Sequence, residues 1–165
     1  MPPPIDAIAF RQALGQFATG VTVITAEREA GKVHGMTANS FTSVSLEPLL
    51  ILVSVDEDAR MLPLLRKKKR FGVSVLKVGQ EKISEFFAQP EQDESAEEAL
   101  GIAFRWTAAG VPVLANTLMQ LSCEVVAAHM SGDHTVFMAE VEGAEIHEGE
   151  PLIYFRGNYR RIAGV

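Results

Sequence analysis

The chain has 165 residues, of which 47% are hydrophobic and 22% charged, proportions typical of one globular domain and not of a disordered chain. Its net charge of −6 argues against general binding to nucleic-acid phosphates, and its longest apolar run, 49–53, is too short to span a bilayer. The amino-terminal segment lacks the basic and hydrophobic regions of a signal peptide, and Cys123 is the only cysteine. We therefore expect a single cytoplasmic domain, 1–165, with no membrane, nucleic-acid or metal partner.

The common nucleotide and hydrolase motifs are absent. No two of the 13 glycines are two residues apart, which excludes a G-x-G-x-x-G fingerprint, and no G-x-x-x-x-G-K-[ST] occurs. There is no G-x-S-x-G around any serine, and the four histidines form no H-x-x-x-H pair. Any cofactor must therefore be held by strands and loops.

Helical patterns are few. Residues 5–19 predict a helix that ends at Gly20, because Phe10, Ala13, Leu14 and Phe17 form one apolar stripe. Residues 59–69 predict a short helix that tolerates Pro63 only in its first turn. A helical turn is expected at 83–87, and the acidic residues 90–100 predict a solvated loop or a short surface helix.

Strand patterns dominate. Residues 21–25 are all β-branched, 49–55 are a largely apolar run, and 119–127 alternate with a period of two. One further strand is predicted to follow a turn at 29–31 and to end near residue 37. Others are predicted over 71–76, from a turn at 131–133 through 141, and over 152–155. Six or more strands with few helices favour a mainly β protein, a closed or nearly closed antiparallel barrel.

Residues 37–45 carry six small hydroxyl or amide side chains in nine residues and are predicted to form a loop. Such a loop offers backbone N–H groups and short donors to an anionic or multiply hydrogen-bonded ligand. The alternative is a turn whose side chains bond to their own backbone.

Gly132, Asp133 and His134 stand at a turn between two predicted strands. Asp133 is positioned to orient the ring of His134, which would then face a cleft as a polar contact or general acid. The alternative is an ordinary hairpin turn with an exposed histidine.

Three other features have simple structural interpretations. The basic run 66–70 is a solvated helix end favoured by the helix dipole, or else a patch for an acidic partner or anionic cofactor. Cys123 is expected to be a buried small hydrophobic residue, and Trp106 a core or interface residue.

Four stretches in this order resemble the flavin reductase-like family. They are Phe17 to Thr25, Gly35 to Ser45, Gly132 to His134, and Pro151 to Phe155. The similarity extends from about Phe10 to Ile162. Members are the short reductase components of two-component flavin monooxygenases, such as the reductase partner of 4-hydroxyphenylacetate hydroxylase.

The resemblance implies a fold and an activity. The implied fold is an FMN-binding split β-barrel, antiparallel and Greek-key-like with a few flanking helices, usually in a homodimer. The implied activity is an NAD(P)H:flavin oxidoreductase that transfers hydride from the nicotinamide to flavin N5 and supplies reduced FMN or FAD to a flavin-dependent oxygenase. The choice between NADH and NADPH, and between FMN and FAD, is open.

The resemblance also implies roles for individual residues. The flavin contacts it implies are Met36, Thr37, Ala38, Asn39, Ser40, Ser54, Val55, Asp56, Ala59, Arg60 and Phe71. The NAD(P)H contacts it implies are Asp133, His134, Arg156, Gly157, Asn158 and Tyr159, with His134 as the residue that positions the nicotinamide. Many relatives carry hydroxyls at the positions of Ala59 and Met61, so Arg60 and backbone donors are the candidate phosphate contacts here.

Two other functions compete with the reductase. One is a split-barrel protein that carries FMN or haem as a carrier or sensor without oxidising NADH. The other is an interaction module whose basic run docks an acidic partner. In that case, mutating the three lysines 67–69 would abolish the complex and leave any reductase activity intact.

Overall fold

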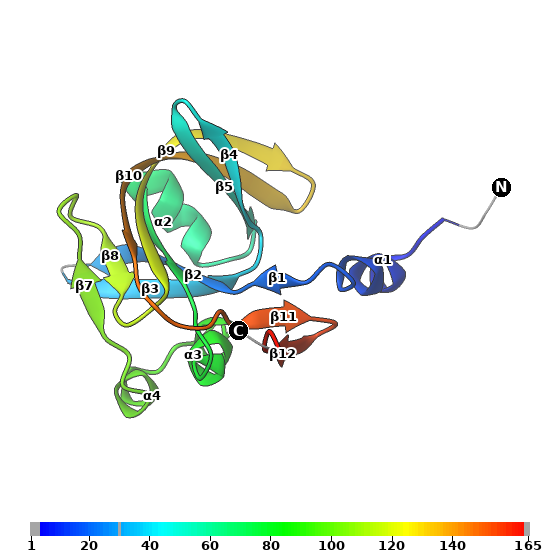
Figure 1. The fold of residues 1–165 in the computed structure, drawn as a ribbon. Coiled ribbons are helices and arrows are strands. Elements are labelled where there is room, and N and C mark those ends of the chain that lie inside the picture. Colours follow the sequence, from blue (N-terminus) through cyan, green and yellow to red (C-terminus); the bar gives the residue numbers. More distant parts are fainter. Residues whose placement is uncertain (1–3, 30, 164–165) are drawn as a thin grey trace.

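The computed structural model describes residues 4–29 and 31–163, and most of their regular structure is β-strand (Figure 1). Seven strands form one antiparallel sheet in the order β3-β2-β6-β9-β10-β5-β4. The expected mainly β, antiparallel fold with a few helices is confirmed. None of the described helices is both long and apolar enough to cross a membrane.

The elements have the following bounds. The helices are α1 (Ala7–Leu14), α2 (Met61–Lys68), α3 (Glu81–Phe87) and α4 (Glu94–Ala99). The strands are β1 (Thr19–Gly20), β2 (Thr22–Glu29), β3 (Lys32–Ala38), β4 (Phe41–Leu46), β5 (Leu49–Asp56), β6 (Arg70–Val75), β7 (Phe104–Trp106), β8 (Pro112–Leu114), β9 (Met119–Ser131), β10 (His134–Ile146), β11 (Ile153–Phe155) and β12 (Asn158–Arg160).

The large sheet curls around α2 but does not close. β3 and β4 are its two edges, and no ladder joins them within the described residues. Two smaller sheets, β1-β11-β12 and β7-β8, lie beside it (Figure 1). The closed form of the expected barrel is therefore not present, and the sheet is open between β3 and β4.

The main core fills the curl of the sheet. Met61, Leu62 and Leu65 of α2 are buried in one cluster with side chains of five strands, among them Phe71 and Phe137. Each such burial stabilises the fold by roughly 1.5–3 kcal/mol. As predicted, α2 occupies the centre of the 59–69 segment, with Pro63 in its first turn and its basic residues in its last.

A second core cluster joins α3 to the sheet, and it requires glycine at position 35. A Cβ on Gly35 would lie 2.4 Å from the ring of Phe87, so only glycine lets α3 pack this closely on β3. Phe87 is fully buried there and makes an edge-on contact with Phe86. The close approach brings the end of α3 beside β3, where the candidate site lies.

The amino-terminal helix is shorter than the predicted 5–19 and buries nothing. Asp6 caps its start by accepting a hydrogen bond from the amide of Ala9, and Gly15 is its carboxyl-terminal cap. The stripe residues Phe10 and Leu14 are more than half exposed. The periodicity correctly predicted an amphipathic helix, but α1 extends away from the sheets (Figure 1), and the described residues bury none of its side chains.

The prediction of a loop over 37–45 is wrong. Its first residues end β3, and 41–45 lie in β4, paired with β5. The hydroxyl groups of Thr42 and Ser43 lie on an exposed edge strand, where polar side chains face water and the backbone is engaged in the ladder. Only Asn39 and Ser40 stand between the two strands.

Several smaller predictions can be compared directly. The turn between β9 and β10 and the strand β11 are confirmed, and the acidic segment contains a short surface helix, α4, capped by Asp93. Trp106 on β7 is 44% exposed and is not a core residue. The predicted turn at 29–31 includes residue 30, which lies outside the described residues. Cys123 is fully buried, and burial raises the pKa of its thiol to about 12, so it is an inert core residue as expected.

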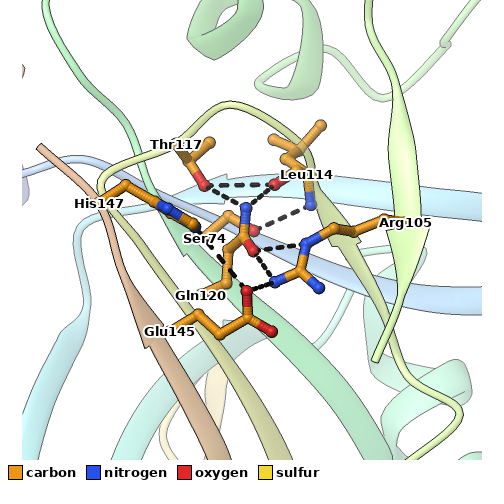
Figure 2. A network of polar contacts seen from close by, with 7 residues as sticks. All are labelled: Ser74, Arg105, Leu114, Thr117, Gln120, Glu145 and His147. Carbon is orange, nitrogen blue, oxygen red and sulfur yellow. Dashed lines mark hydrogen bonds and ion pairs between the residues drawn. The ribbon is translucent and has the colours of Figure 1, made fainter. Parts of the chain in front are cut away.

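A polar network anchors the β7–β8 hairpin to the large sheet (Figure 2). The amide of Gln120, 3% exposed, donates to the carbonyl of Leu114 over 2.6 Å and to the hydroxyl of Thr117 over 3.1 Å. Its oxygen accepts from Arg105 Nε over 2.8 Å, and the Arg105 guanidinium continues to Glu145 on β10. One amide thus joins β7, β8, β9 and, through Arg105, β10.

Replacement of Gln120 by leucine tests this network. We expect Gln120→Leu to lower the free energy of unfolding by about 1–3 kcal/mol, because Arg105 and the Leu114 carbonyl lose buried partners. Urea denaturation measures the change. The control Gln12→Leu, on the exposed helix α1, should change stability by less than about 0.5 kcal/mol. Equal unfolding midpoints for the two variants would contradict the assigned role.

Candidate functional site

Three clefts follow β3 and its continuation to residue 39. We call them the helix cleft, the tyrosine cleft and the arm cleft, with volumes of about 450, 170 and 780 Å³. The helix cleft is lined by residues 34–36, 58–61 and 87–90 with Asp56 and Gln92; the tyrosine cleft by 37–39 with Val21, Ser84, Ala88, Tyr154 and Tyr159; and the arm cleft by 14–17 with Ile8, Arg11, Gln12, Asn39, Tyr154, Arg156 and Gly157.

The clefts adjoin one another. Ala88 lines both the helix and the tyrosine cleft, and Asn39 and Tyr154 line both the tyrosine and the arm cleft. The volumes of the helix and arm clefts lie within the range of small-molecule sites, and the tyrosine cleft that joins them is smaller. Seven of the predicted flavin contacts line this track, namely Met36, Thr37, Ala38, Asn39, Asp56, Ala59 and Arg60.

The hydroxyls of the predicted flavin-binding segment are largely engaged with the protein itself. Thr37 donates to the carbonyl of Ser84 over 2.7 Å, and Ser40 donates to the carbonyl of Ser54 over 2.8 Å. Both hydroxyls bond to backbone carbonyls of other elements, so they do not form the self-bonded turn that was the alternative for this segment. The exposed amide of Asn39 has no such bond among the described residues, so it and the backbone groups remain as donors to a ligand.

Two predicted flavin contacts cannot present a side chain to a ligand in this protomer. Phe71 is fully enclosed in the main core and lines no cleft, and the side chain of Val55 is 1% exposed in the same cluster. The physical reason is register: both side chains face the concave side of the sheet, where α2 covers them. Both side chains pack in the core beneath the strands that carry the site. Ser54 also lines none of the three clefts.

The Gly132–His134 turn lies next to the helix cleft. Pairing of β10 with β5 sets His134 opposite Asp56, and the amide of Glu57 donates to the carbonyl of Asp133 over 2.9 Å. His134 Nδ1 lies 2.8 Å from the carboxylate of Asp133, and this hydrogen bond lowers the pKa of Asp133. A carboxylate can only accept, so Nδ1 carries the proton and Nε2 of the neutral ring is an acceptor.

A cluster of three side chains holds that turn against α2. Arg66 Nη2 donates to Glu57 Oε2 over 3.2 Å and to the hydroxyl of Thr135 over 3.1 Å. Thr135, which is buried, also donates to Glu57. The residue that follows His134 is thus tied to both the segment before α2 and the last turn of α2. This is the main role of Arg66 from the basic run.

The predicted NAD(P)H contacts fall in two places. Arg156 and Gly157 line the arm cleft and Tyr159 lines the tyrosine cleft, whereas Asp133 and His134 lie beside the helix cleft. None of the three clefts is lined by both groups.

The β11–β12 turn is held in place by the amino-terminal segment. Arg156 Nε donates to Gln16 Oε1 over 2.7 Å, and its guanidinium lies 4.9 Å from the centre of the Phe155 ring. Asn158 donates to the carbonyl of Arg156 over 2.8 Å and lines none of the three clefts. Tyr159 donates to Ser84 Oγ, which fixes its ring against α3.

Several cleft residues were missed by sequence reasoning, among them Tyr154, Ser84 and His34. His34 is 8% exposed, lines the helix cleft, and has no side-chain hydrogen bond within the described part of the chain. Its only sequence signal is its position directly before the Gly35–Ser45 motif. No group of three or more histidine, cysteine or acidic side chains in residues 4–29 and 31–163 is arranged to hold a metal.

A family model described as a flavin reductase like domain matches residues 14–163. The chain belongs to this flavin reductase family. The match covers every cleft-lining residue except those at the beginning of α1. The expectation drawn from the four sequence stretches is therefore confirmed at the level of the family.

Individual relatives refine the comparison. An NADH-dependent flavin reductase of a Rhodococcus species is 41% identical over 162 residues, which cover 97% of this chain and 89% of the relative. The reductase component of a 4-hydroxyphenylacetate 3-monooxygenase from Thermus thermophilus is 40% identical over 156 residues, covering 93% and 95%. The expected class of enzyme, a flavin reductase, is confirmed by these relatives.

A solved structure gives the same fold. An NADH:FAD oxidoreductase of Streptomyces globisporus, determined with NAD and FAD fragments, is 37% identical and superposes with a TM-score of 0.85, covering 96% of this flavin reductase and 94% of that chain.

Removal of the Thr135 hydroxyl tests how this flavin reductase positions His134. Thr135→Val loses the bonds to Glu57 and Arg66, a loss of about 1 kcal/mol. We expect the KM for NADH to rise roughly threefold to tenfold, with kcat at saturating NADH and flavin affinity unchanged. Steady-state kinetics separates these quantities. Thr42→Val, on the exposed strand β4, is the control, and equal KM values for both variants would refute the positioning role.

Proposed function

We propose that the protein oxidises NADH or NADPH, transfers the hydride to FMN or FAD, and releases the reduced flavin to a partner flavin-dependent oxygenase. The supporting observation is that a polar histidine, His134, stands beside Asp56 at the edge of a cleft lined by the implied flavin contacts. We further propose that residues 1–165 form one domain, and that it is cytoplasmic, where a lone thiol such as Cys123 remains reduced.

The residues present fit a flavin. The helix and tyrosine clefts adjoin at Ala88 and together offer an elongated space with a cationic group, Arg60, at one end and the aromatic rings of Tyr154 and Tyr159 at the other. A phosphate is suited to the guanidinium and to the start of α2.

The chemistry itself belongs to the bound cofactors, since a dihydronicotinamide supplies the hydride and the flavin ring accepts it. The role of the protein is to bring the nicotinamide ring and the flavin ring into contact in the orientation that hydride transfer requires. His134 Nε2, an acceptor in the neutral ring, is suited to a carboxamide N–H of the nicotinamide. Asp133 keeps the ring in that tautomer. No proton transfer by the protein is required for the hydride step.

The alternative is a carrier or sensor that binds flavin or haem without oxidising reduced nicotinamides. A carrier has no need of a held histidine at the cleft edge, and the fixed Asp133–His134 pair therefore favours the reductase. The two functions differ in one measurement, the flavin-dependent oxidation of NADH.

Replacement of His134 by alanine tests the proposed reductase. NADH oxidation at 340 nm should require added FMN or FAD, and His134→Ala should lower kcat/KM for NADH roughly fivefold to fiftyfold, chiefly through KM, since a positioning contact is lost. His129→Ala, an exposed histidine on the neighbouring strand β9, is the matched control. Flavin binding without oxidation of NADH or NADPH would refute the reductase and leave the carrier.

We also propose that the protein is a homodimer. The apolar side chains Ile8, Phe10 and Leu14 of α1 are more than half exposed, and α1 has no buried residue. An isolated helix of eight residues is marginal in water, so its apolar face needs a partner surface. A second copy of the chain supplies one.

Light scattering after size-exclusion chromatography tests the dimer. The expected mass is about twice the 17.9 kDa of one chain. Phe10→Glu should shift the protein toward the monomer, because a carboxylate on the apolar face of α1 opposes burial. Lys67→Gln, at the exposed end of α2, is the control for a change of one charge unit. A monomeric wild-type protein would contradict the proposal.

A further inference from the structure

The imidazole of His34 is largely buried, and its ring nitrogens, which are not fully enclosed, have no hydrogen-bond partner among the described residues. It is 8% exposed, lies on β3 opposite Ala26 of β2, and forms part of the wall of the helix cleft. No side-chain hydrogen bond of His34 exists within residues 4–29 and 31–163. Because these nitrogens are not fully enclosed and the ring forms part of the cleft wall, a group bound in the helix cleft can supply the hydrogen-bond partner that the protein does not.

Cationic groups surround this imidazole. Burial lowers the pKa of His34, and the guanidinium groups of Arg28 and Arg60 lower it further. The ring is consequently neutral at pH 7 in the protein without ligand. Arg28 comes from the exposed end of β2 and Arg60 from the residue before α2, so the two charges approach the ring from different elements.

The other charged groups of the cleft are acidic. Asp56, at the end of β5, and Asp58 line it, and Glu91, between α3 and α4, pairs with Arg60. Glu91 is exposed, and its pair with Arg60 is at the surface, where such pairs contribute little. An anion entering the cleft can therefore replace Glu91 as the partner of Arg60.

The start of α2 opens into the same cleft. Arg60 occupies the N-cap position without a capping hydrogen bond from its side chain, and the first turn contains no acidic residue. Ala59, Arg60 and Met61 all line the cleft. The positive end of the helix dipole thus lacks a counter-charge from α2 itself, and a phosphate is the anion such a position commonly binds.

From these contacts we propose that His34 is a further ligand of the flavin phosphate, and that the imidazole takes up a proton when the phosphate enters the helix cleft. The inference rests on the proposed flavin reductase function and names a residue that this function left unassigned. A phosphate offsets the field of Arg28 and Arg60 and offers the acceptor that the ring lacks, and both effects favour the protonated imidazole. The phosphate group is common to FMN and FAD, and riboflavin lacks it.

Calorimetric titration at pH 7 in two buffers of different ionisation enthalpy measures proton uptake on binding. With FAD, whose pyrophosphate does not titrate near pH 7, the wild type should take up a fraction of one proton per flavin. With FMN the monoester phosphate, with a pKa of about 6, also titrates, so the difference between wild type and His34→Gln isolates the histidine. Riboflavin should bind without uptake. If only one of FMN and FAD shows uptake, that flavin is the one whose phosphate reaches the cleft.

The His34→Gln variant provides the affinity test. At pH 6 it should bind FMN or FAD roughly fivefold to twentyfold more weakly than the wild type does, and riboflavin equally well. The loss should shrink toward pH 8, where protonation is less favourable. His129→Gln, exposed on β9, is the control. Circular dichroism establishes folding; if the variant does not fold, the pH dependence of the FAD to riboflavin affinity ratio in the wild type gives the same test, because the FAD pyrophosphate does not titrate in this range.

The results separate two failures. If His34→Gln leaves proton uptake and the ratio of FMN to riboflavin affinity unchanged, the role of His34 is refuted while the reductase stands. If flavins bind with the expected proton uptake but NADH is not oxidised, the reductase is refuted and the phosphate contact stands. If phosphorylated flavins bind no better than riboflavin at any pH, the helix cleft is not a phosphate site.

Discussion

The burial of one face of α2 inside the curled sheet determines where every other part of the site lies. An eight-residue helix does not persist in water by itself, so α2 depends on the enclosure of Met61, Leu62 and Leu65. Only four residues connect the end of β5 to α2, and they carry the start of the helix to the same place as the end of that strand. The helix cleft is the space left between this corner, β3 and the end of α3.

Two polar clusters stabilise the long β9–β10 ribbon near its opposite ends. Glu57, Arg66 and Thr135 hold the start of β10 against α2, and Gln120 with Arg105 holds the region where β9 begins and β10 ends (Figure 2). The first cluster adjoins the site, whereas the second fastens a hairpin away from the clefts. Hydrogen bonds and ion pairs are directional, so fixing both ends of the β9–β10 ribbon opposes a shift in the register of one strand along the other.

Local sequence patterns predicted the elements that depend on local physics. The β-branched and apolar runs at 21–25 and 49–55 are strands, and the turn at 131–133 falls where Gly132 adopts a positive φ. The same patterns failed where burial depends on distant residues. The stripe on α1 is amphipathic but uncovered, and the hydroxyls of 41–45 lie on an edge strand and not in a loop.

The site was predictable in composition but not in arrangement. The grouping of residues 36–40 with Asp56 and Arg60 came from family resemblance, because the contact between β3 and the start of α2 is non-local. Phe71 was assigned to the site, but its register turns it into the core. His34 was passed over because nothing in its neighbourhood along the chain reveals that Arg28, Arg60 and the end of α3 surround it.

The enclosure of the single thiol has a consequence for durability. Reduced flavin that reaches solution reacts with dioxygen and forms peroxide, so an enzyme that releases reduced flavin is exposed to a thiol oxidant. Thiol oxidation proceeds through the exposed thiolate, and Cys123 is neither exposed nor ionised at physiological pH. The catalyst therefore carries no cysteine that peroxide can readily inactivate or cross-link, and its working lifetime does not depend on a thiol-repair system.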